Sequence, residues 1–372
     1  MTMTPRERFL ANACFEPIDR PYRLETLGYW FETLDRWHGE GLPSDVVDVA
    51  SAAVYFQIDL QLPIHMGADQ HPGLDPIFAE EIVEQDERYI IKRDVKGALV
   101  KVFSDYSSGI PSLVEAPVKD EASWEEMKTR LDPDTPGRLE FWKPLIELAN
   151  TEPWPLCVYL CGLFGTHRHL FGFKDLMVAY RRQPQLLHAI SRHWVGFWKG
   201  VVSHIHSIHR PEMVSLWEDM CYRNGPMISP DVFAEFMLPY YKELIAFLKQ
   251  DLGVPVIGVD TDGKMTKLIP LFVEAGVNFL YPFEVQSEMD VIRIREEWPH
   301  QFAIWGGIDK RALIEDRGTI EAEVMRVVPP MLEKGGYIPA ADHAIPPDVP
   351  LENWRFFLDL VRDLGQRICS KA

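Results

Sequence analysis

Carboxylate side chains and one histidine recur at the ends of short apolar runs in the second two-thirds of this chain. Six runs that read as strands are followed by polar residues and then by a helical segment, at Cys161-Gly162, Glu218-Asp219, Asp260-Thr261-Asp262-Gly263, Pro282-Phe283-Glu284, Gly306-Gly307-Ile308-Asp309 and Asp342-His343. Alternating strands and helices predict a parallel sheet flanked by helices. When such a sheet closes into an eight-stranded barrel, all strands open their carboxyl ends onto one face, where catalytic groups collect. Because five of the six ends carry carboxylates, the pattern indicates an enzyme.

The elements that must position these residues form one continuous series. Eight segments have the composition of buried strands: Tyr22–Leu27, Ala53–Leu62, Leu156–Leu160, Met213–Trp217, Val254–Val259, Asn278–Tyr281, Phe302–Trp305 and Gly336–Pro339. Eight strands with intervening helices predict a (β/α)8 barrel of the α/β class, the TIM barrel. We find no linker, low-complexity tract or solenoid-like repeat, so we expect residues 1–372 to form a single domain.

A stretch of different texture interrupts the series at about residues 80–104. Glu81–Glu84, Tyr89–Arg93 and Ala98–Phe103 are rich in β-forming residues and are separated by short polar turns. This spacing predicts an antiparallel β-meander inserted between barrel strands. The insertion has two interpretations, a lid or wall over the site and a purely structural addition.

Composition restricts the class of partner. The chain of 372 residues is 47% hydrophobic and 25% charged, as is typical of a globular protein with a large core. Its formal net charge of -18 argues against nucleic acid or an anionic membrane as a partner, because both would be repelled. No apolar run is long enough to cross a bilayer, and the first residues lack the apolar core of a secretory signal. The five scattered cysteines fit a reducing compartment, so we expect a cytoplasmic protein.

A set of short motifs runs in order along residues 150–365. It comprises Trp217-Glu218-Asp219-Met220, Asn224-Gly225-Pro226, Asp260-Thr261-Asp262-Gly263, Glu274-Ala275-Gly276-Val277, Gly306-Gly307-Ile308-Asp309, Gly335-Gly336-Tyr337-Ile338-Pro339 and Asp342-His343-Ala344-Ile345-Pro346. Together these motifs resemble the uroporphyrinogen decarboxylase superfamily of (β/α)8 barrels. The resemblance implies one of two chemistries, cofactor-free decarboxylation of a tetrapyrrole or zinc-dependent methyl transfer involving a corrinoid protein.

The decarboxylase branch is matched poorly near the N-terminus. Its members hold substrate carboxylates with an arginine-rich loop after the first strand, whereas the corresponding stretch here is Glu25-Thr26-Leu27-Gly28-Tyr29-Trp30. Asp59 is a candidate for the aspartate that gathers pyrrole N–H groups, and His343 matches a C-terminal histidine. Without the arginines, an anionic tetrapyrrole would lack charge-assisted partners. We therefore do not expect a typical uroporphyrinogen decarboxylase.

The methyltransferase branch implies a metal site. Its members bind zinc through a His-x-Cys motif at the fifth strand end and a cysteine at the eighth, and here Asp260, Asp262 and His343 occupy these positions. The resemblance thus implies a triad suited to zinc, manganese or iron(II). The alternatives are local: Asp260 caps a helix and Asp262 makes a turn bond. His343, next to Asp342, also suits general acid/base catalysis or a hydrogen-bonded loop.

The remaining candidates each have a chemical and a structural interpretation. Glu218 and Asp219 are adjacent on a strand, so only one of them can enter the barrel mouth, where burial would raise its pKa and suit it to donate a proton. The alternative is an ion pair. Arg168 suits a substrate carboxylate or phosphate, or a surface ion pair. We expect substrate contacts at Tyr29, Arg168, Asp219 and Glu284. We expect catalytic roles for Glu218, Asp260 and His343.

Three functions remain open. The first is a methyltransferase that demethylates a small methoxylated or methylated compound and passes the methyl group to a partner corrinoid protein, with zinc as the expected divalent metal. The second is a cofactor-free decarboxylase of a smaller carboxylated substrate, in which Arg168 holds the acid and Asp260 or His343 protonates the carbanion. The third is a non-catalytic barrel that binds tetrapyrroles or corrinoids. The resemblance to the decarboxylases also implies a homodimer.

Overall fold

Seven parallel strands form the central sheet of the computed structural model, which describes residues 2–25, 27–104 and 111–369, so that Thr26 of the first expected strand lies outside the description. The strands are β1 Leu62–Met66, β6 Leu156–Cys161, β7 Met213–Trp217, β10 Val256–Asp260, β11 Phe279–Tyr281, β12 Ala303–Trp305 and β13 Tyr337–Ile338. They pair side by side in this order. The last six lie where the sequence predicted strands, and the predicted α/β class is confirmed.

The prediction of a second strand at Ala53–Leu62 is wrong over most of this range. Helix α3 spans Val49–Phe56, and strand β1 begins only at Leu62. A capping box between Asp48 and Ser51 starts this helix. A short apolar run does not by itself distinguish a strand from a helix, and here the cap residues favour the helix.

The first expected strand, Tyr22–Leu27, is extended but is not assigned as a strand over its described residues. It nevertheless occupies the place of the eighth strand. The Asp59 N–H donates to the Arg23 carbonyl at 2.8 Å, just before β1, and the Ile345 N–H donates to the Gly28 carbonyl at 2.9 Å, beyond β13. The segment therefore fills the interval between the two ends of the sheet, as in a closed barrel.

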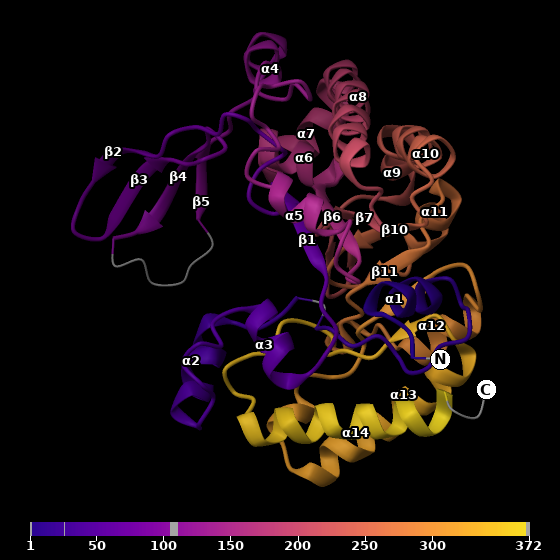
Figure 1. Ribbon diagram of the computed structural model, residues 1–372. Coiled ribbons are helices and arrows are strands. Elements are labelled where there is room, and N and C mark those ends of the chain that lie inside the picture. Colours follow the sequence, from indigo (N-terminus) through magenta and orange to yellow (C-terminus); the bar gives the residue numbers. More distant parts are fainter. Residues whose placement is uncertain (1, 26, 105–110, 370–372) are drawn as a thin grey trace.

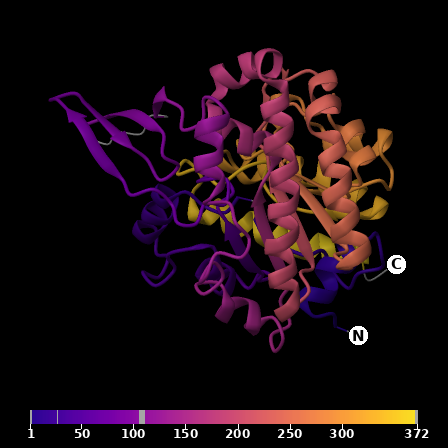
Figure 2. The ribbon, with the colours of Figure 1, turned by 90° about the horizontal axis from the view of Figure 1, so that it is seen from above.

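Helices surround the strands, as Figures 1 and 2 show. Before β1 lie α1 Pro5–Ala13 and α2 Phe31–Gly39 in addition to α3. The later helices are α4 Glu121–Lys128, α5 Lys143–Leu148, α6 Leu163–Phe171, α7 Phe173–Arg182, α8 Pro184–Ile208, α9 Pro230–Phe236, α10 Leu238–Ala246, α11 Ile269–Ala275, α12 Val291–Glu297, α13 Arg317–Lys334 and α14 Leu351–Cys369. Strand β6 is buried along almost its whole length, as expected for a parallel strand covered on both faces. Among the residues that the structure describes, none of the helices combines the length and apolar character needed to span a bilayer.

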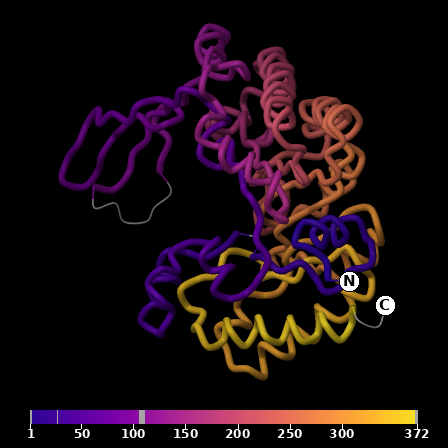
Figure 3. Tube along the Cα trace, viewed as in Figure 1, coloured from indigo at the N-terminus to yellow at the C-terminus, as the bar shows by residue number. Residues whose placement is uncertain are grey.

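A separate antiparallel sheet stands away from the barrel (Figures 1 and 3). It consists of β2 Glu81–Gln85, β3 Tyr89–Arg93, β4 Leu99–Phe103 and β5 Ser112–Glu115. The first three strands confirm the predicted meander. The fourth, a strand of four residues, lies beyond the predicted boundary at about residue 104.

Candidate active site

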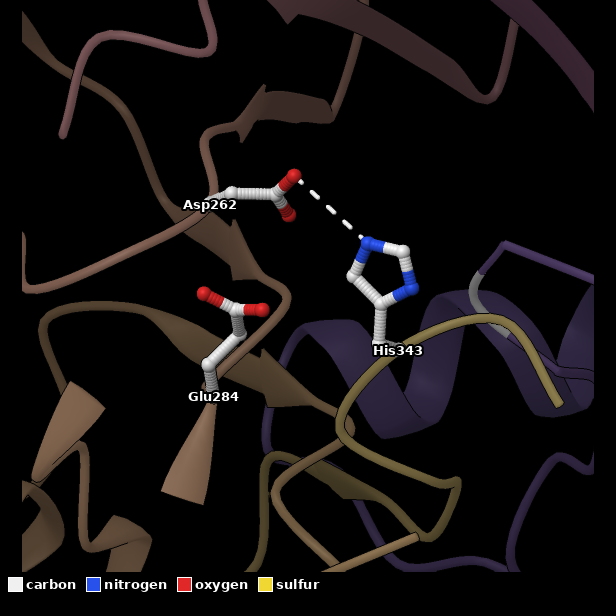
Figure 4. A group of neighbouring side chains, drawn as sticks. All are labelled: Asp262, Glu284 and His343. Carbon is white, nitrogen blue, oxygen red and sulfur yellow. Dashed lines mark ion pairs between the residues drawn. The ribbon is translucent and has the colours of Figure 1, made fainter. Parts of the chain in front are cut away.

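Three side chains from three different strand ends meet at the mouth of the barrel. They are Asp262 after β10, Glu284 after β11 and His343 after β13 (Figure 4). Each offers one possible ligand atom, and these atoms all lie within 4.8 Å of one another. The closest ion pair among them joins His343 Nε2 to Asp262 Oδ2 at 3.6 Å. Two carboxylate oxygens and one imidazole nitrogen suit zinc, manganese or iron(II).

The state of Asp262 supports a bound cation at this position. Its Oδ1 is buried and has no hydrogen-bond partner among the described residues. Leaving a buried polar atom without a partner costs about 1–3 kcal/mol, and more when the atom carries charge. A divalent ion ligated by Asp262, Glu284 and His343 would remove that cost, so the residues present fit a metal.

Two acids connect the loops that carry this group. The Gly263 N–H donates to Glu284 Oε2 at 2.8 Å, which joins the loops after β10 and β11. The buried Asp342 accepts from the Val285 N–H at 2.9 Å and from the Lys310 N–H at 3.1 Å. The Asp342 carboxylate therefore holds neighbouring loops in place.

A cavity of about 340 Å³ lies inside the barrel next to this group. Its wall includes Trp217 on β7, Asp260 on β10 and Tyr281 on β11, which are register partners across adjacent strands. Glu25 and Asp69 add two further carboxyl groups, and no lysine or arginine of the described residues lines the cavity. Parallel strands in register point their partner side chains the same way, so the strand ends define one chemical surface.

Asp260 belongs to this cavity and not to the group of Asp262, Glu284 and His343. Sequence reasoning placed Asp260 in the metal triad, and the structure brings Glu284 to the group instead. Burial, with repulsion from Asp262 and then from other carboxylates, raises the pKa of Asp260 well above its usual range. The raised pKa favours the protonated form of the carboxyl group, which can donate a proton or hydrogen bond, whereas a cation placed beside it would favour the ionised form.

Glu25 is a cavity residue that sequence reasoning missed. It is 5% exposed, and its Oε2 accepts a hydrogen bond from the Ala341 N–H at 2.9 Å. Burial raises the pKa of Glu25 to about 8. Its place in the sequence, in the stretch where the decarboxylases carry their arginine-rich loop, was the available signal.

Glu218, which follows β7 and was expected to donate a proton, places its carboxylate at the start of helix α6. Its two carboxylate oxygens accept from the Leu163 and Gly165 N–H groups, each at 2.9 Å. Burial raises the pKa of Glu218 to about 8, although these backbone bonds act in the opposite direction. A Cβ at Gly162 would collide with the carboxylate, so glycine is needed there. The geometry gives Glu218 the role of a helix cap, which satisfies free N–H groups at the helix start.

Arg168 and Asp219, both expected to contact substrate, contact each other. Arg168 Nη1 donates to the Asp219 carbonyl at 2.8 Å, and Nη2 donates to Asp219 Oδ2 at 2.9 Å. The guanidinium also lies 5.0 Å from the centre of the Trp217 ring. Of the two interpretations of Arg168, the structure shows the ion pair.

Two other residues associated with substrate lie in structural clusters. Tyr29 packs edge to face against Trp37 and Trp354, with ring centroids 5.5 Å and 5.7 Å apart, and it does not line the cavity. Asp59, the candidate for gathering pyrrole N–H groups, is buried and forms an ion pair with Arg8 at 2.9 Å. A second arginine also pairs with Asp59. Both acceptor oxygens of Asp59 are therefore engaged.

A barrel of parallel strands with titratable side chains at one mouth defines a TIM-barrel enzyme. The family profile described as uroporphyrinogen decarboxylase (URO-D) matches residues 100–364, so the chain belongs to the URO-D family. It is an atypical member, because its similarity to named uroporphyrinogen decarboxylases is low.

Two relatives illustrate that distance. The uroporphyrinogen decarboxylase of Syntrophotalea carbinolica is 29% identical over 143 residues, which are 38% of this chain and only 40% of that protein. The uroporphyrinogen decarboxylase of a Nitratiruptor species is 23% identical over 332 residues, covering 87% of this chain and 84% of that one. A solved structure described as a methyltransferase from Methanosarcina mazei has a TM-score of 0.65 at 15% identity, covering 97% of this chain and 99% of the other. At that identity the likeness shows a shared fold.

Proposed function

We propose that this protein is a methyltransferase that removes a methyl group from a small methylated or methoxylated compound and passes it to a corrinoid carried by a partner protein. The observation that carries the proposal is the group Asp262, Glu284 and His343 beside a cavity that, within the described parts of the chain, has no lysine or arginine in its wall. The fold shared with the methyltransferase from Methanosarcina mazei supports this choice within the family.

Each part of the site has a role in such a transfer. Asp262, Glu284 and His343 would hold a divalent metal, for which zinc is the expected ion, and such an ion supplies Lewis-acid polarisation of the heteroatom that carries the methyl group. Asp260, facing the cavity, donates a hydrogen bond to that heteroatom when neutral and balances a positive charge on it when ionised. The cavity walls exclude water from the methyl carbon. This carbon bonds to the cobalt(I) corrinoid as its bond to the heteroatom breaks, and the electron pair stays on the heteroatom.

Decarboxylation is the second candidate, and two observations favour it. The named relatives are uroporphyrinogen decarboxylases, and the raised pKa of Asp260 suits protonation of a carbanion. A carboxylate substrate, however, needs a cationic partner in a buried site. The cavity wall offers none, and Arg168 is engaged by Asp219. Charge therefore favours methyl transfer.

The test combines metal analysis with a transfer assay. Purified wild type should hold about one divalent ion per chain, and Asp262→Ala and His343→Ala should lose it, because each removes one of three ligands. Asp309→Ala serves as the control, since Asp309 is a strand-end acid paired with Arg311 outside this group. Wild type should also methylate cobalt(I) corrinoid from some member of a panel of methylated amines and methoxylated aromatics, followed by absorbance. Release of carbon dioxide that chelators do not affect, with no methylation of the corrinoid, would instead establish the decarboxylase.

A further inference from the structure

Three buried acids elsewhere in this barrel each have at least two hydrogen-bond or ion-pair partners. Asp59 pairs with two arginines, Glu218 accepts two backbone N–H groups, and Asp342 accepts two more. Burying a carboxylate without such partners is costly, so these arrangements are the normal ones. They set the standard against which the cavity can be compared.

The two acids inside the cavity depart from that standard. Glu25 is buried and receives one backbone N–H, and no cationic side chain among the described residues lies within ion-pair distance of it. No hydrogen bond from the described part of the chain reaches the carboxylate of Asp260. Asp69 adds a third carboxylate at the exposed rim. No lysine or arginine among the described residues lines the cavity, so the described part of the chain places no cationic side chain beside these groups.

The rest of the wall is also suited to a cation. Among the described residues its one basic side chain is His65, and desolvation by neighbouring atoms lowers the pKa of His65, which favours the uncharged imidazole. Tyr159, Trp217 and Tyr281 contribute aromatic rings, and aromatic side chains together with carboxylates are the groups that recognise ammonium ions. A volume of about 340 Å³ lies at the small end of ligand cavities.

We infer that the methyl donor is a small methylated ammonium compound whose positive charge lies between Glu25 and Asp260. This inference rests on the proposed function for the transfer step, whereas the charge of the ligand rests on the cavity alone. The methyl carbon leaves nitrogen as it bonds to cobalt. Nitrogen keeps the electron pair of the broken bond and departs as a neutral amine. Because an ammonium nitrogen has no free lone pair, it is not polarised by a Lewis acid, and the polarisation described for the metal applies only to a methoxylated donor. The cobalt(I) corrinoid of the partner protein is oxidised to cobalt(III) as it takes up the methyl group. Atoms and charge balance without a proton donor.

The experiment compares two probes of the same shape. Choline carries a trimethylammonium group, and 3,3-dimethylbutan-1-ol replaces it with an uncharged tert-butyl group. Isothermal titration calorimetry on the full-length protein at pH 9, above the pKa of about 8 of Glu25, should give choline an affinity at least about tenfold higher, equivalent to about 1.4 kcal/mol. Equal affinity for the two probes, or no binding of choline, would overturn the inference.

Variants locate the charge that is recognised. Asp260→Asn and Glu25→Gln keep the shape of the side chain, and each should lower choline affinity about tenfold while leaving the affinity for the alcohol unchanged, which also confirms that the variant is folded. Glu288→Gln is the matched control, because Glu288 is exposed and pairs with Lys264, yet its loss changes the net charge equally. A preference for choline that survives both cavity variants, or that falls as far in the control, would contradict the assigned position.

The two proposals fail in different ways. If choline is preferred but no methylated amine or methoxylated compound methylates cobalt(I) corrinoid, the cation site stands and the proposed methyltransferase fails. If methyl transfer occurs from a neutral methoxylated compound and choline does not bind, the proposed function stands and the inference fails.

Discussion

The Glu25 carboxyl group makes the stability of this protein depend on pH in an unusual direction. Burial raises its pKa to about 8, against a usual value of 4.5 in the unfolded chain. Between these two values the folded state holds a proton that the unfolded state has released, so the free energy of unfolding falls as pH rises. At about 1.4 kcal/mol per unit, the full difference of roughly 3.5 units corresponds to at most ~5 kcal/mol. Glu25→Gln keeps an acceptor for the Ala341 N–H and removes this titration.

Urea unfolding of wild type and Glu25→Gln between pH 5 and pH 9 measures the effect. The two proteins should be nearly equal in stability at pH 5, and the variant should become the more stable one as pH rises, with the gap levelling off above about pH 8. Glu218 titrates in the same range, but it is present in both proteins and cancels in the comparison. A gap that does not change with pH would show that Glu25 is ionised or well solvated in the folded protein, and the reasoning from burial would be refuted.

Three further substitutions, one with a matched control, test interactions described above. Gly162→Ala should cost about 1–3 kcal/mol of stability, because its new Cβ collides with the Glu218 carboxylate. The control Gly196→Ala, at an exposed position of α8 with no atom within 4 Å, should be neutral or stabilising by up to about 1 kcal/mol. Thermal unfolding compares the two variants, and similar behaviour of both would exclude the collision. Asp342→Ala should cost about 2–4 kcal/mol and speed metal loss to a chelator, because two loop N–H groups lose their acceptor; unchanged metal retention would separate this carboxylate from the site. Asp59→Asn should cost about 3–5 kcal/mol in urea unfolding, because it leaves two arginines without their anion, and a loss below about 1 kcal/mol would mean that this ion pair contributes little.

Local sequence patterns were sufficient for the strand ends of the second two-thirds of the chain. The apolar run before Asp260 and the polar residues after it mark the end of β10, and the same holds for the strands before Glu284 and His343. Such runs are local, since each strand buried on both faces has to be apolar throughout. The meander could also be predicted from local sequence, because its β-forming segments are separated by short polar turns.

The N-terminal part was harder because its signals conflict. The run that includes Val49–Phe56 is apolar, and its length suits a strand or a short helix equally. The N-cap residue Asp48 lies just before that run and forms a capping box with Ser51 inside it, which favours the helix. The place of the eighth strand is taken by an extended segment held through a few hydrogen bonds, which no periodicity in the sequence reveals.

The sequence by itself determined that Asp262, Glu284 and His343 lie at strand ends, because strand boundaries can be predicted from the local change from apolar to polar residues. Only the tertiary structure decided which acids share a site. The alternation of side chains that would aim Asp260 and Asp262 at one opening holds only within a strand, and β10 ends at Asp260. The chain turns at Gly263, directly after Asp262, with a φ of +77° that favours glycine. Asp262 lies beside Glu284 and His343, whereas Asp260 lines the cavity together with Glu25. These partners come from distant parts of the chain, and their proximity follows from closure of the barrel.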